Sequence, residues 1–283
     1  MRQPSEDRLL AWLRGRLGPG SLAGDDAAVL PRGAWAVTVD SQIAGVHVDP
    51  GADPALLARR LLAVNLSDLA AMGALPAYAF LALSAVRGFD HRRFFRAFLA
   101  ACRSHRLALA GGDLATHPTA TTATLTLLGR RRRGGRWLAR GNARPGDALW
   151  LGGTVGESAA GRVLLDTGGP GSGAGAAARR AVRRHLLPSP QLALSGWLAR
   201  QPRAAAIDVS DGVALDLRRL CRESGVGAVV EPEALPLAPG FAALCRRLGR
   251  DPLELALGGG EDYVLLFALP SRREPPARFG CRR

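Results

Sequence analysis

Acidic residues recur in this sequence where apolar segments begin or end. In α/β folds, binding sites are built at such ends. Taken singly, each residue also has an ordinary role as a helix cap or a turn residue. The phrases concerned are GDDAAVL (Asp25, Asp26), VTVDS (Asp40), VNLSDLAAMG (Asp68), AGGDLA (Asp113), AIDVSDG (Asp208, Asp211) and LGGGEDYVLLF (Glu261, Asp262).

If these carboxylates converge, they need cations between them. Two carboxylates about 4 Å apart repel by about 4 kcal/mol at an effective dielectric constant near 20. Oxygen ligands without a cysteine or histidine cluster favour Mg²⁺, which typically bridges substrate phosphates. The glycines at 111–112 and 258–260 would let the backbone approach a phosphate closely. The pattern therefore indicates a site with several Mg²⁺ ions for phosphoryl transfer.

Asp68 is out of place in an otherwise apolar helix. A helix is predicted from Asp53 as N-cap, with Pro54 in its first turn, to Gly73. Its expected core-facing stripe contains Asp68, and Arg59 and Arg60 are expected to point elsewhere. An unpaired ionised carboxylate on that stripe would be costly, so Asp68 must either take up a proton or find a cation. The stripe is Leu57, Leu61, Val64, Asp68 and Met72.

Strand-like and helix-like segments alternate around these residues. This mixture predicts two α+β or α/β domains. The turn phrase RPGD opens a new strand, so the domain boundary is placed just before it, giving domains 1–143 and 144–283. A Gly/Ala-rich stretch, TGGPGSGAGAAA, is expected to be a mobile loop. Strands are expected at 34–39, 77–86, 107–111, 122–129, 148–153, 204–209 and 262–270, and helices at 53–72, 91–105, 157–166, 190–199 and 211–223.

The bulk composition is typical of a globular cytoplasmic protein. Of the 283 residues, 47% are apolar and 22% charged. No apolar run approaches the roughly 18–20 residues that cross a bilayer, and the charged N-terminus does not read as a signal peptide. The four cysteines show no CxxC spacing, which favours reduced thiols. We therefore expect a cytoplasmic location and no membrane partner.

The formal charge of +14 does not indicate a nucleic-acid partner. Every basic residue other than histidine is arginine, which points to compositional drift along the whole chain. The run RRRR at 130–133 is interpreted as a solvated hairpin turn, and aromatic residues for base stacking are few. Because the sequence lacks lysine, a GxxxxGK[ST] phosphate loop is excluded.

Taken in order, the motifs resemble the thiamine-monophosphate kinase family, which belongs to the superfamily of aminoimidazole ribonucleotide synthetase. They run from about residue 24 to residue 267, and SDLAAMGA and GGGEDY are the most specific. The matching phrases are GDDAAVL, VTVDSQIAGVHV, AVNLSDLAAMGALP, AGGDLA, RGNARPGDALWLGGTVGESAAG, RHLLPSPQ, AIDVSDGVALDL and GGGEDYVLLF.

The resemblance implies an enzyme that uses ATP and several Mg²⁺ ions to convert thiamine monophosphate to thiamine diphosphate. It implies a homodimer whose N-terminal mixed-sheet domains form a shared barrel, each followed by a C-terminal α/β domain. Because the attacking phosphate oxygen is already ionised, we expect direct in-line transfer with no covalent or general-base residue. The implied metal ligands are Asp26, Thr38, Asp40, Asp68, Asp113, Asp208 and Asp211; the implied ATP contacts are Gly112, Asp113, Arg140 and Ser210; and the implied substrate contacts are His47 and Glu261.

Two positions depart from the family pattern. Val39 stands where the family can have a hydroxyl residue. After GGGEDY the chain ends in PSRREPPARFGCRR, where the family has further strands and an aromatic residue that packs on thiamine, so that wall is expected to be missing unless the partner subunit or Phe279 replaces it. Two alternatives remain open. One is another ATP-using enzyme of the superfamily, of the selenophosphate or aminoimidazole ribonucleotide synthetase type, and the other is a truncated nucleotide-binding paralogue without turnover.

Overall fold

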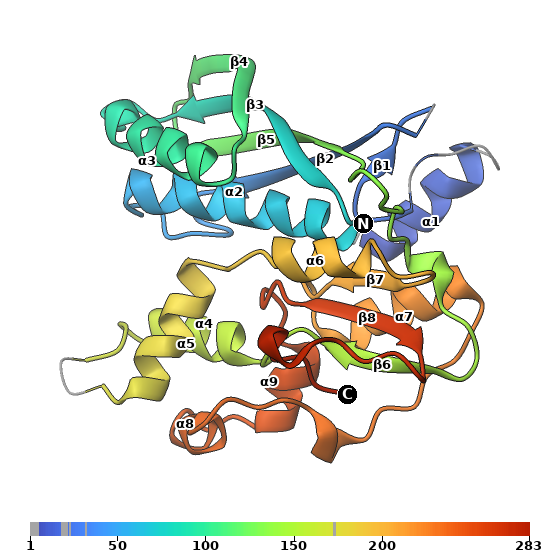
Figure 1. Cartoon of the computed structure of the whole chain (residues 1–283). Coiled ribbons are helices and arrows are strands. Elements are labelled where there is room, and N and C mark those ends of the chain that lie inside the picture. Colours follow the sequence, from blue (N-terminus) through green and yellow to red (C-terminus); the bar gives the residue numbers. More distant parts are fainter. Residues whose placement is uncertain (1–5, 18–21, 23, 32, 172–173) are drawn as a thin grey trace.

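A five-stranded sheet forms the framework of the first half of the chain (Figure 1). The structure is a computed structural model that describes residues 6–17, 22, 24–31, 33–171 and 174–283. The strand order is β1-β2-β5-β3-β4, antiparallel except for the parallel pair β3–β4. The strands are β1 (Ala28–Val29), β2 (Trp35–Ile43), β3 (Leu75–Ala85), β4 (Ala108–Thr116) and β5 (Thr122–Arg130).

Two helices, α2 (Pro54–Ala71) and α3 (His91–Ser104), cover one face of this sheet. Strand β5 shows why the face is apolar: Ala123, Leu125 and Leu127 alternate with polar neighbours and are fully buried. Together with Phe94 and Phe98 of α3, they belong to the core of this half. The opposite face of the sheet carries exposed side chains.

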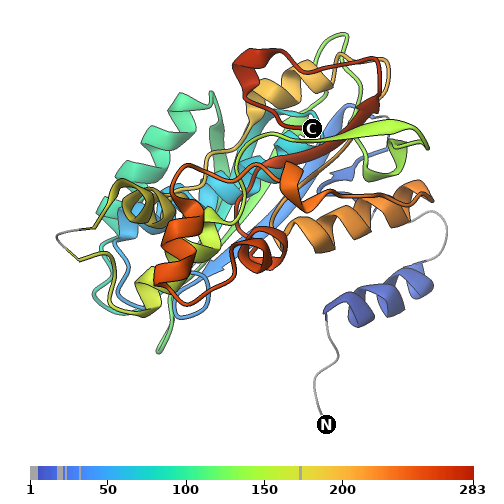
Figure 2. The ribbon, with the colours of Figure 1, turned by 90° about the horizontal axis from the view of Figure 1, so that it is seen from below.

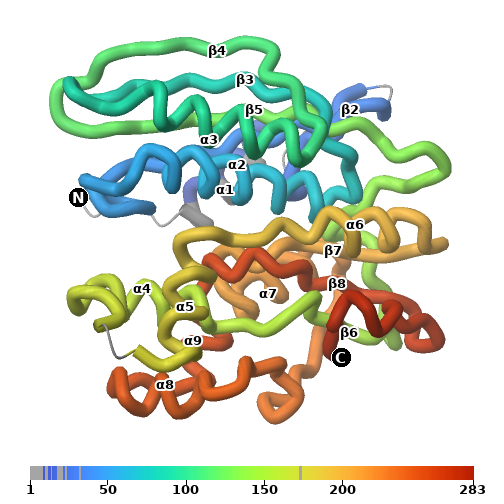
Figure 3. Tube along the Cα trace, turned by 60° about the vertical axis from the view of Figure 1, so that its left-hand side comes forward, coloured from blue at the N-terminus to red at the C-terminus, as the bar shows by residue number. Residues whose placement is uncertain are grey.

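Helix α2 begins and ends where its sequence predicts. The Asp53 carboxylate accepts a hydrogen bond from Ala55 N at 2.9 Å, and Pro54 follows in the first turn. At the other end Gly73 has φ +72°, a conformation that glycine adopts without strain. On its second side α2 contacts α6 (Leu192–Leu198) and β7 (Ala205–Asp208), so it lies between the two halves of the chain (Figure 3).

A three-stranded antiparallel sheet, ordered β6-β8-β7, organises the second half. Its strands are β6 (Asp147–Leu151), β7 and β8 (Leu265–Pro270). The N-terminal helix α1 (Glu6–Leu17) is set apart from the rest of the chain in Figure 2. The other helices are α4 (Glu157–Asp166), α5 (Ala176–Leu186), α7 (Val213–Ser224), α8 (Phe241–Arg247) and α9 (Pro252–Gly258), with 3₁₀ turns η1 (Arg140–Asn142), η2 (Pro232–Ala234) and η3 (Ala277–Phe279).

Two strands are longer than expected, and this changes where two candidate ligands lie. The segment expected to stop at 39 continues to Ile43, and the segment expected to stop at 111 continues to Thr116. Asp40 and Asp113 therefore sit within strands, paired with Leu125 and Ala82. Hydrogen bonds to neighbouring strands extend β2 and β4, and local residue types alone do not predict such pairing.

One other expectation holds in part and two are wrong. Of the stretch expected as a loop at 167–178, the described residues before Ala176 lie outside helices and strands, but α5 begins at Ala176, and residues 172–173 lie outside the described residues. The RRRR run is not a hairpin, because β5 ends at Arg130 and the chain passes to the second sheet. In this connection Arg132 is partly buried and donates hydrogen bonds to the carbonyl oxygens of Gly73 and Ala74, both at 3.2 Å. Arg60, expected to point away from the core, is fully buried.

The final residues pack back onto the second half. Phe279 lies beside Trp197 with ring centroids 6.2 Å apart, and Arg278 lies over the Phe279 ring. Arg282 forms an isolated antiparallel bridge with Leu151. In the described residues, the contacts of Phe279 are thus with the body of its own chain. Among these residues, no helix combines the length and apolarity required to cross a membrane.

Candidate active site

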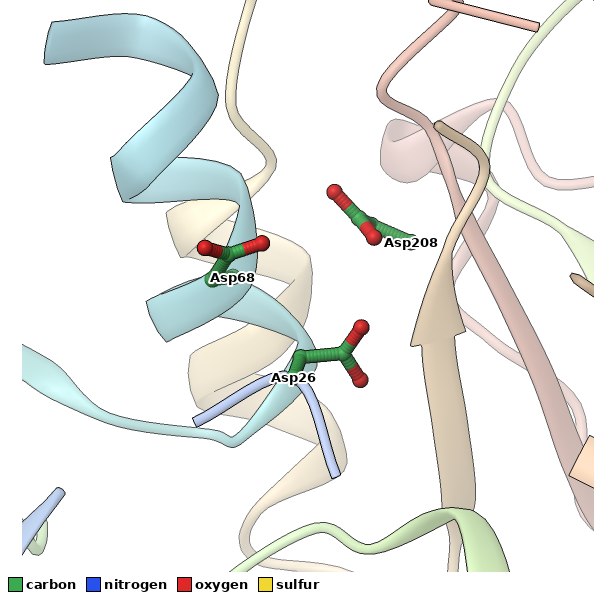
Figure 4. A group of neighbouring side chains, drawn as sticks. All are labelled: Asp26, Asp68 and Asp208. Atoms are coloured by element: carbon green, nitrogen blue, oxygen red, sulfur yellow. The ribbon is translucent and has the colours of Figure 1, made fainter. Parts of the chain in front are cut away.

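Three aspartates from distant parts of the sequence meet between the two halves of the chain (Figure 4). Asp26 precedes β1, Asp68 belongs to the last turns of α2, and Asp208 is the last residue of β7. Each offers one carboxylate oxygen, and these oxygens lie within 4.8 Å of one another. At such separations three ionised carboxylates repel strongly without a cation between them.

Asp68 is held by a strand of the first sheet. Thr38 Oγ1 on β2 donates a hydrogen bond to Asp68 Oδ2 at 2.5 Å. Burial raises the pKa of Asp68 well above its usual value, and the neighbouring charge of Asp26 raises the pKa further, while the Thr38 hydrogen bond lowers it. Without a cation, the surroundings thus favour the protonated form.

Asp208 is the most enclosed of the three. The residue is 2% exposed, and its Oδ2 has no hydrogen-bond partner among the described residues. Burial raises the pKa of Asp208 well above its usual value, and the charges of Asp26 and Asp68 add to this, while the nearby Ser67 hydroxyl lowers the pKa. A buried carboxylate oxygen without a partner, facing two more carboxylates, fits a divalent cation with oxygen ligands such as Mg²⁺.

Arg140 supplies the positive charge nearest to the group. Its Nη2 and Nε donate to the two oxygens of Asp26 at 2.7 and 3.3 Å, and its backbone N–H donates to Asp25 at 2.7 Å. Burial acts to lower the pKa of Arg140, but the charge and hydrogen bonds of Asp26 outweigh this and the pKa is raised. The single positive charge of Arg140 balances only one of the three carboxylate charges, so the site still favours cations.

The loop after β7 is fixed by a residue that sequence reasoning missed. Asp216, in the first turn of α7, is fully buried and accepts hydrogen bonds from Ser210 N at 3.1 Å and Asp211 N at 2.9 Å. Burial raises the pKa of Asp216 to about 6. The available signal was an acidic residue shortly after the SDG turn, on the apolar stripe of a helix that also contains Val213 and Leu217.

Asp211 itself turns outward. Its carboxylate pairs with Arg219, and its side chain is 47% exposed. It does not belong to the group formed by Asp26, Asp68 and Asp208. Ser210, by contrast, presents its carbonyl oxygen to Glu261 N at 2.7 Å, which ties this loop to the next one.

Of the other site residues expected from the sequence, some lie close to the three aspartates and others lie away from them. Asp40 lies two positions after Thr38 on β2, so both side chains leave the same face of the strand. Its charge acts on Asp68, and burial raises its own pKa. Gly112 and Asp113 instead lie on β4, an edge strand exposed along its whole length, and Asp113 is not part of the group of three.

His47 and Glu261 border the same region. His47 Nδ1 accepts a hydrogen bond from Ile43 N at 3.1 Å. Glu261 accepts from Arg60 Nη2, and its Oε2 lies 3.2 Å from His185 Nδ1. The charges of His47, Arg60 and Glu261 all act on the pKa of Asp40, so these groups lie near it. Sequence reasoning missed Arg60; its signal was an arginine inside a helix whose neighbours are apolar.

The chain is similar to known proteins over most of its length. Residues 24–130 match the family model described as AIR synthase related protein, N-terminal domain. The chain is 40% identical over 253 residues to the thiamine-monophosphate kinase of Salmonella typhimurium, covering 87% of this chain and 75% of that protein. With the thiamine-monophosphate kinase of Escherichia coli K12 it shares 39% identity over 254 residues, with the same coverage of both.

Solved structures show the same relationship. The structure titled "AaThiL complexed with AMPPCP and TMP" superposes with a TM-score of 0.89 at 28% identity, covering 98% of this chain and 88% of that one. The crystal structure of thiamine monophosphate kinase from Aquifex aeolicus gives 0.88 at 28% identity, covering 98% and 91%. The fold is therefore that of the AIR synthase-related proteins, and the chain is an enzyme of the thiamine-monophosphate kinase family.

Proposed function

We propose that this chain transfers the terminal phosphoryl group of ATP to thiamine monophosphate and so produces thiamine diphosphate. The observation that carries the proposal is the meeting of Asp26, Asp68 and Asp208, with an unpartnered buried oxygen on Asp208. It is supported by relatives named thiamine-monophosphate kinase and by the similar structure whose title includes AMPPCP and TMP.

The metal site is proposed to be built from both halves of the chain. Asp26, Asp68 and Asp208 would hold Mg²⁺, with Thr38 and Asp40 beside them. Magnesium bound there would neutralise the phosphates of both anionic substrates. For Asp113 and Asp211 a ligand role rests on the resemblance, and Asp211 would have to leave Arg219 to fulfil it.

The substrates are proposed to lie on either side of this metal site. Gly112, Asp113, Arg140 and Ser210 are assigned to ATP, and His47 and Glu261 to thiamine monophosphate. The acceptor oxygen is already ionised at neutral pH, so the chain needs no general base and no covalent intermediate. What the residues supply is charge balance and alignment: Arg140 moderates the charge of Asp26, and Asp216 holds the Ser210–Asp211 backbone.

A homodimer is part of the proposal. Strand β4 is exposed along its length, and the uncovered face of the first sheet carries apolar side chains. Exposed edges and apolar faces of this kind favour association. The apolar side chains of that face are Val39 (60% exposed), Tyr78 (43%) and Phe80 (41%). A second copy would bury this face in a shared barrel, with residues 1–143 as the metal-binding, ATP-binding and dimerisation domain and 144–283 as the second domain.

A coupled assay of ADP release tests the activity. Purified protein with ATP and Mg²⁺ should release ADP when thiamine monophosphate is added, and a parallel titration should show nucleotide binding. Nucleotide binding without substrate-dependent ADP release would show a binding protein without turnover. Consumption of ATP with a substrate of the selenophosphate or aminoimidazole ribonucleotide synthetase type, but not with thiamine monophosphate, would indicate another activity of the superfamily.

Because the cysteines are free and no membrane partner is expected, the cytoplasm is the proposed location.

A further inference from the structure

Arg60 is a fully buried arginine at the junction of the two halves of the chain. Its Nε donates a hydrogen bond to Gln42 Oε1 on β2 at 2.9 Å. Its Nη1 donates to the carbonyl oxygen of His185 near the end of α5, and its Nη2 donates to Glu261 Oε1 before β8. One guanidinium thus joins the first sheet, α5 and the loop that carries Glu261.

Such a contact is specific to arginine. A buried charge is costly unless its hydrogen bonds are satisfied, and here each of the three guanidinium nitrogens has an acceptor in a different element. The planar guanidinium fixes the directions of these bonds, whereas a lysine ammonium is a single point charge on a flexible stem. The position of Glu261 relative to α2 is therefore set by the shape of the Arg60 side chain.

The backbone of Glu261 is fixed as well. Glu261 has φ +57°, and its N–H donates to Ser210 O at 2.7 Å. A Cβ on the preceding Gly260 would lie only 2.7 Å from that same oxygen, so the two loops pack without spare room. The Glu261 side chain nevertheless stays 30% exposed, which leaves one edge open to a ligand.

The second oxygen of Glu261 meets a histidine. Its Oε2 lies 3.2 Å from His185 Nδ1, which also lies 3.2 Å from Ser158 Oγ. Burial lowers the pKa of His185 to about 4, and the charges of Arg60 and Arg162 contribute. His185 is therefore neutral at physiological pH, and Arg60 is the cation paired with Glu261.

Arg60 and Asp68 lie on the same helix. They are eight residues apart, which is about 12 Å along an α-helix axis. Helix α2 therefore carries a proposed metal ligand at one point and the partner of a proposed substrate contact at another. We propose that Arg60 is a positioning residue that holds the Glu261 carboxylate at a fixed distance from the metal site, so that thiamine monophosphate is aligned with ATP. This inference rests on the proposed function.

Steady-state kinetics of Arg60→Met, Arg60→Lys and the control Arg59→Met test the inference. Arg59 is the adjacent residue of α2 and is exposed. Arg60→Met should raise KM for thiamine monophosphate about tenfold or more and leave KM for ATP within about twofold of the unsubstituted protein. Arg60→Lys should give a KM for thiamine monophosphate between those of the unsubstituted protein and Arg60→Met. Arg59→Met should change neither KM. A purely structural role would instead lower kcat through loss of active protein and leave both KM values unchanged.

A double substitution tests whether Arg60 acts through Glu261. If it does, Arg60→Met combined with Glu261→Gln should raise KM for thiamine monophosphate no more than Glu261→Gln alone. Independent, multiplicative effects of the two substitutions would overturn the inference, as would an unchanged KM in Arg60→Met. If Arg60→Met does not fold, Arg60→Lys is subject to the same comparison.

Hydrogen–deuterium exchange supplies a readout that needs no activity. Arg60→Met should speed exchange of the Glu261 amide in peptides covering 258–264, whereas Arg59→Met should not. If the unsubstituted protein does not phosphorylate thiamine monophosphate, the proposed function fails, and the exchange result still decides whether Arg60 holds Glu261. Equal exchange in all three proteins would overturn the positioning role.

Discussion

At the scale of single residues, the site is a problem of charge balance. Asp68 occupies a position that an apolar side chain would ordinarily take, and its pKa is raised by burial and by Asp26. The two explanations open at the sequence level, a proton or a cation, describe the two states of one site. Without metal, the surroundings favour a proton on Asp68 and Asp208; with metal, both can ionise.

Replacement of Asp68 by asparagine should separate these states. In chelator, Asp68→Asn replaces a buried carboxyl group whose raised pKa destabilises the fold at neutral pH, so the variant should melt at the same temperature as the unsubstituted protein or higher. With millimolar Mg²⁺ and ATP the order should reverse, because ligands that bind only the folded state stabilise by mass action. Melting curves in both buffers check this. Equal stabilisation of both proteins by Mg²⁺ and ATP would mean that Asp68 is not a ligand.

The stability of the metal-free protein should depend on pH. The raised pKa values of Asp68, Asp208, Asp216 and Asp262 mean that the folded state binds more protons than the unfolded state above pH 3.8. For Asp216 and Asp262 the window ends at about 6. Each of these four carboxyl groups should therefore lower stability by about 1.4 kcal/mol per pH unit as pH rises from about 4 to 6, while His185, whose pKa is lowered to about 4, offsets one of them; the net stability should fall. Urea unfolding in chelator at several pH values measures the free energy of unfolding. A free energy of unfolding that rises with pH over this range would contradict the raised pKa values.

At the scale of elements, the sequence predicts local structure better than it predicts contacts between elements. Asp53, Pro54 and Gly73 mark the ends of α2 because capping depends on nearby residues. By contrast, burial of Arg60 depends on Gln42, His185 and Glu261, which lie up to 201 residues away, so a helical-periodicity argument could not reach it. For the same reason, the positions of Asp26, Asp68 and Asp208 at the ends of apolar segments suggested a shared site, but they could not show which of the carboxylates meet.

Gly112 should be essential to the pairing of β4 with β3. A Cβ at Gly112 would lie 1.9 Å from the Leu81 carbonyl oxygen, a backbone atom that cannot move without disturbing the ladder. At the adjacent Gly111 the nearest atom is a ring carbon of Phe80, 3.3 Å away. Gly112→Ala should therefore destabilise by about 1–3 kcal/mol, and Gly111→Ala by clearly less. Denaturant midpoints of the two variants check this, and equal midpoints would contradict the strand register.

At the scale of the whole molecule, association of two copies would cover what the single chain leaves exposed. Light scattering at micromolar concentration should give the mass of a homodimer, because the surface formed by Val39, Tyr78 and Phe80 is apolar. Phe80→Glu should shift the mass toward the monomer by placing charge on that surface. A monomeric mass for the unsubstituted chain, with or without nucleotide, would contradict the dimer.

The central claim is that aspartates from both halves of the chain hold magnesium for direct phosphoryl transfer. Transfer of label from γ-³²P-ATP tests it most directly, with Asp208→Asn as the matched variant. We predict labelled thiamine diphosphate in Mg²⁺, none in chelator, a loss of orders of magnitude in Asp208→Asn, and no label left on the acid-quenched protein. Labelled protein, or labelled thiamine diphosphate formed equally well by Asp208→Asn, would contradict it.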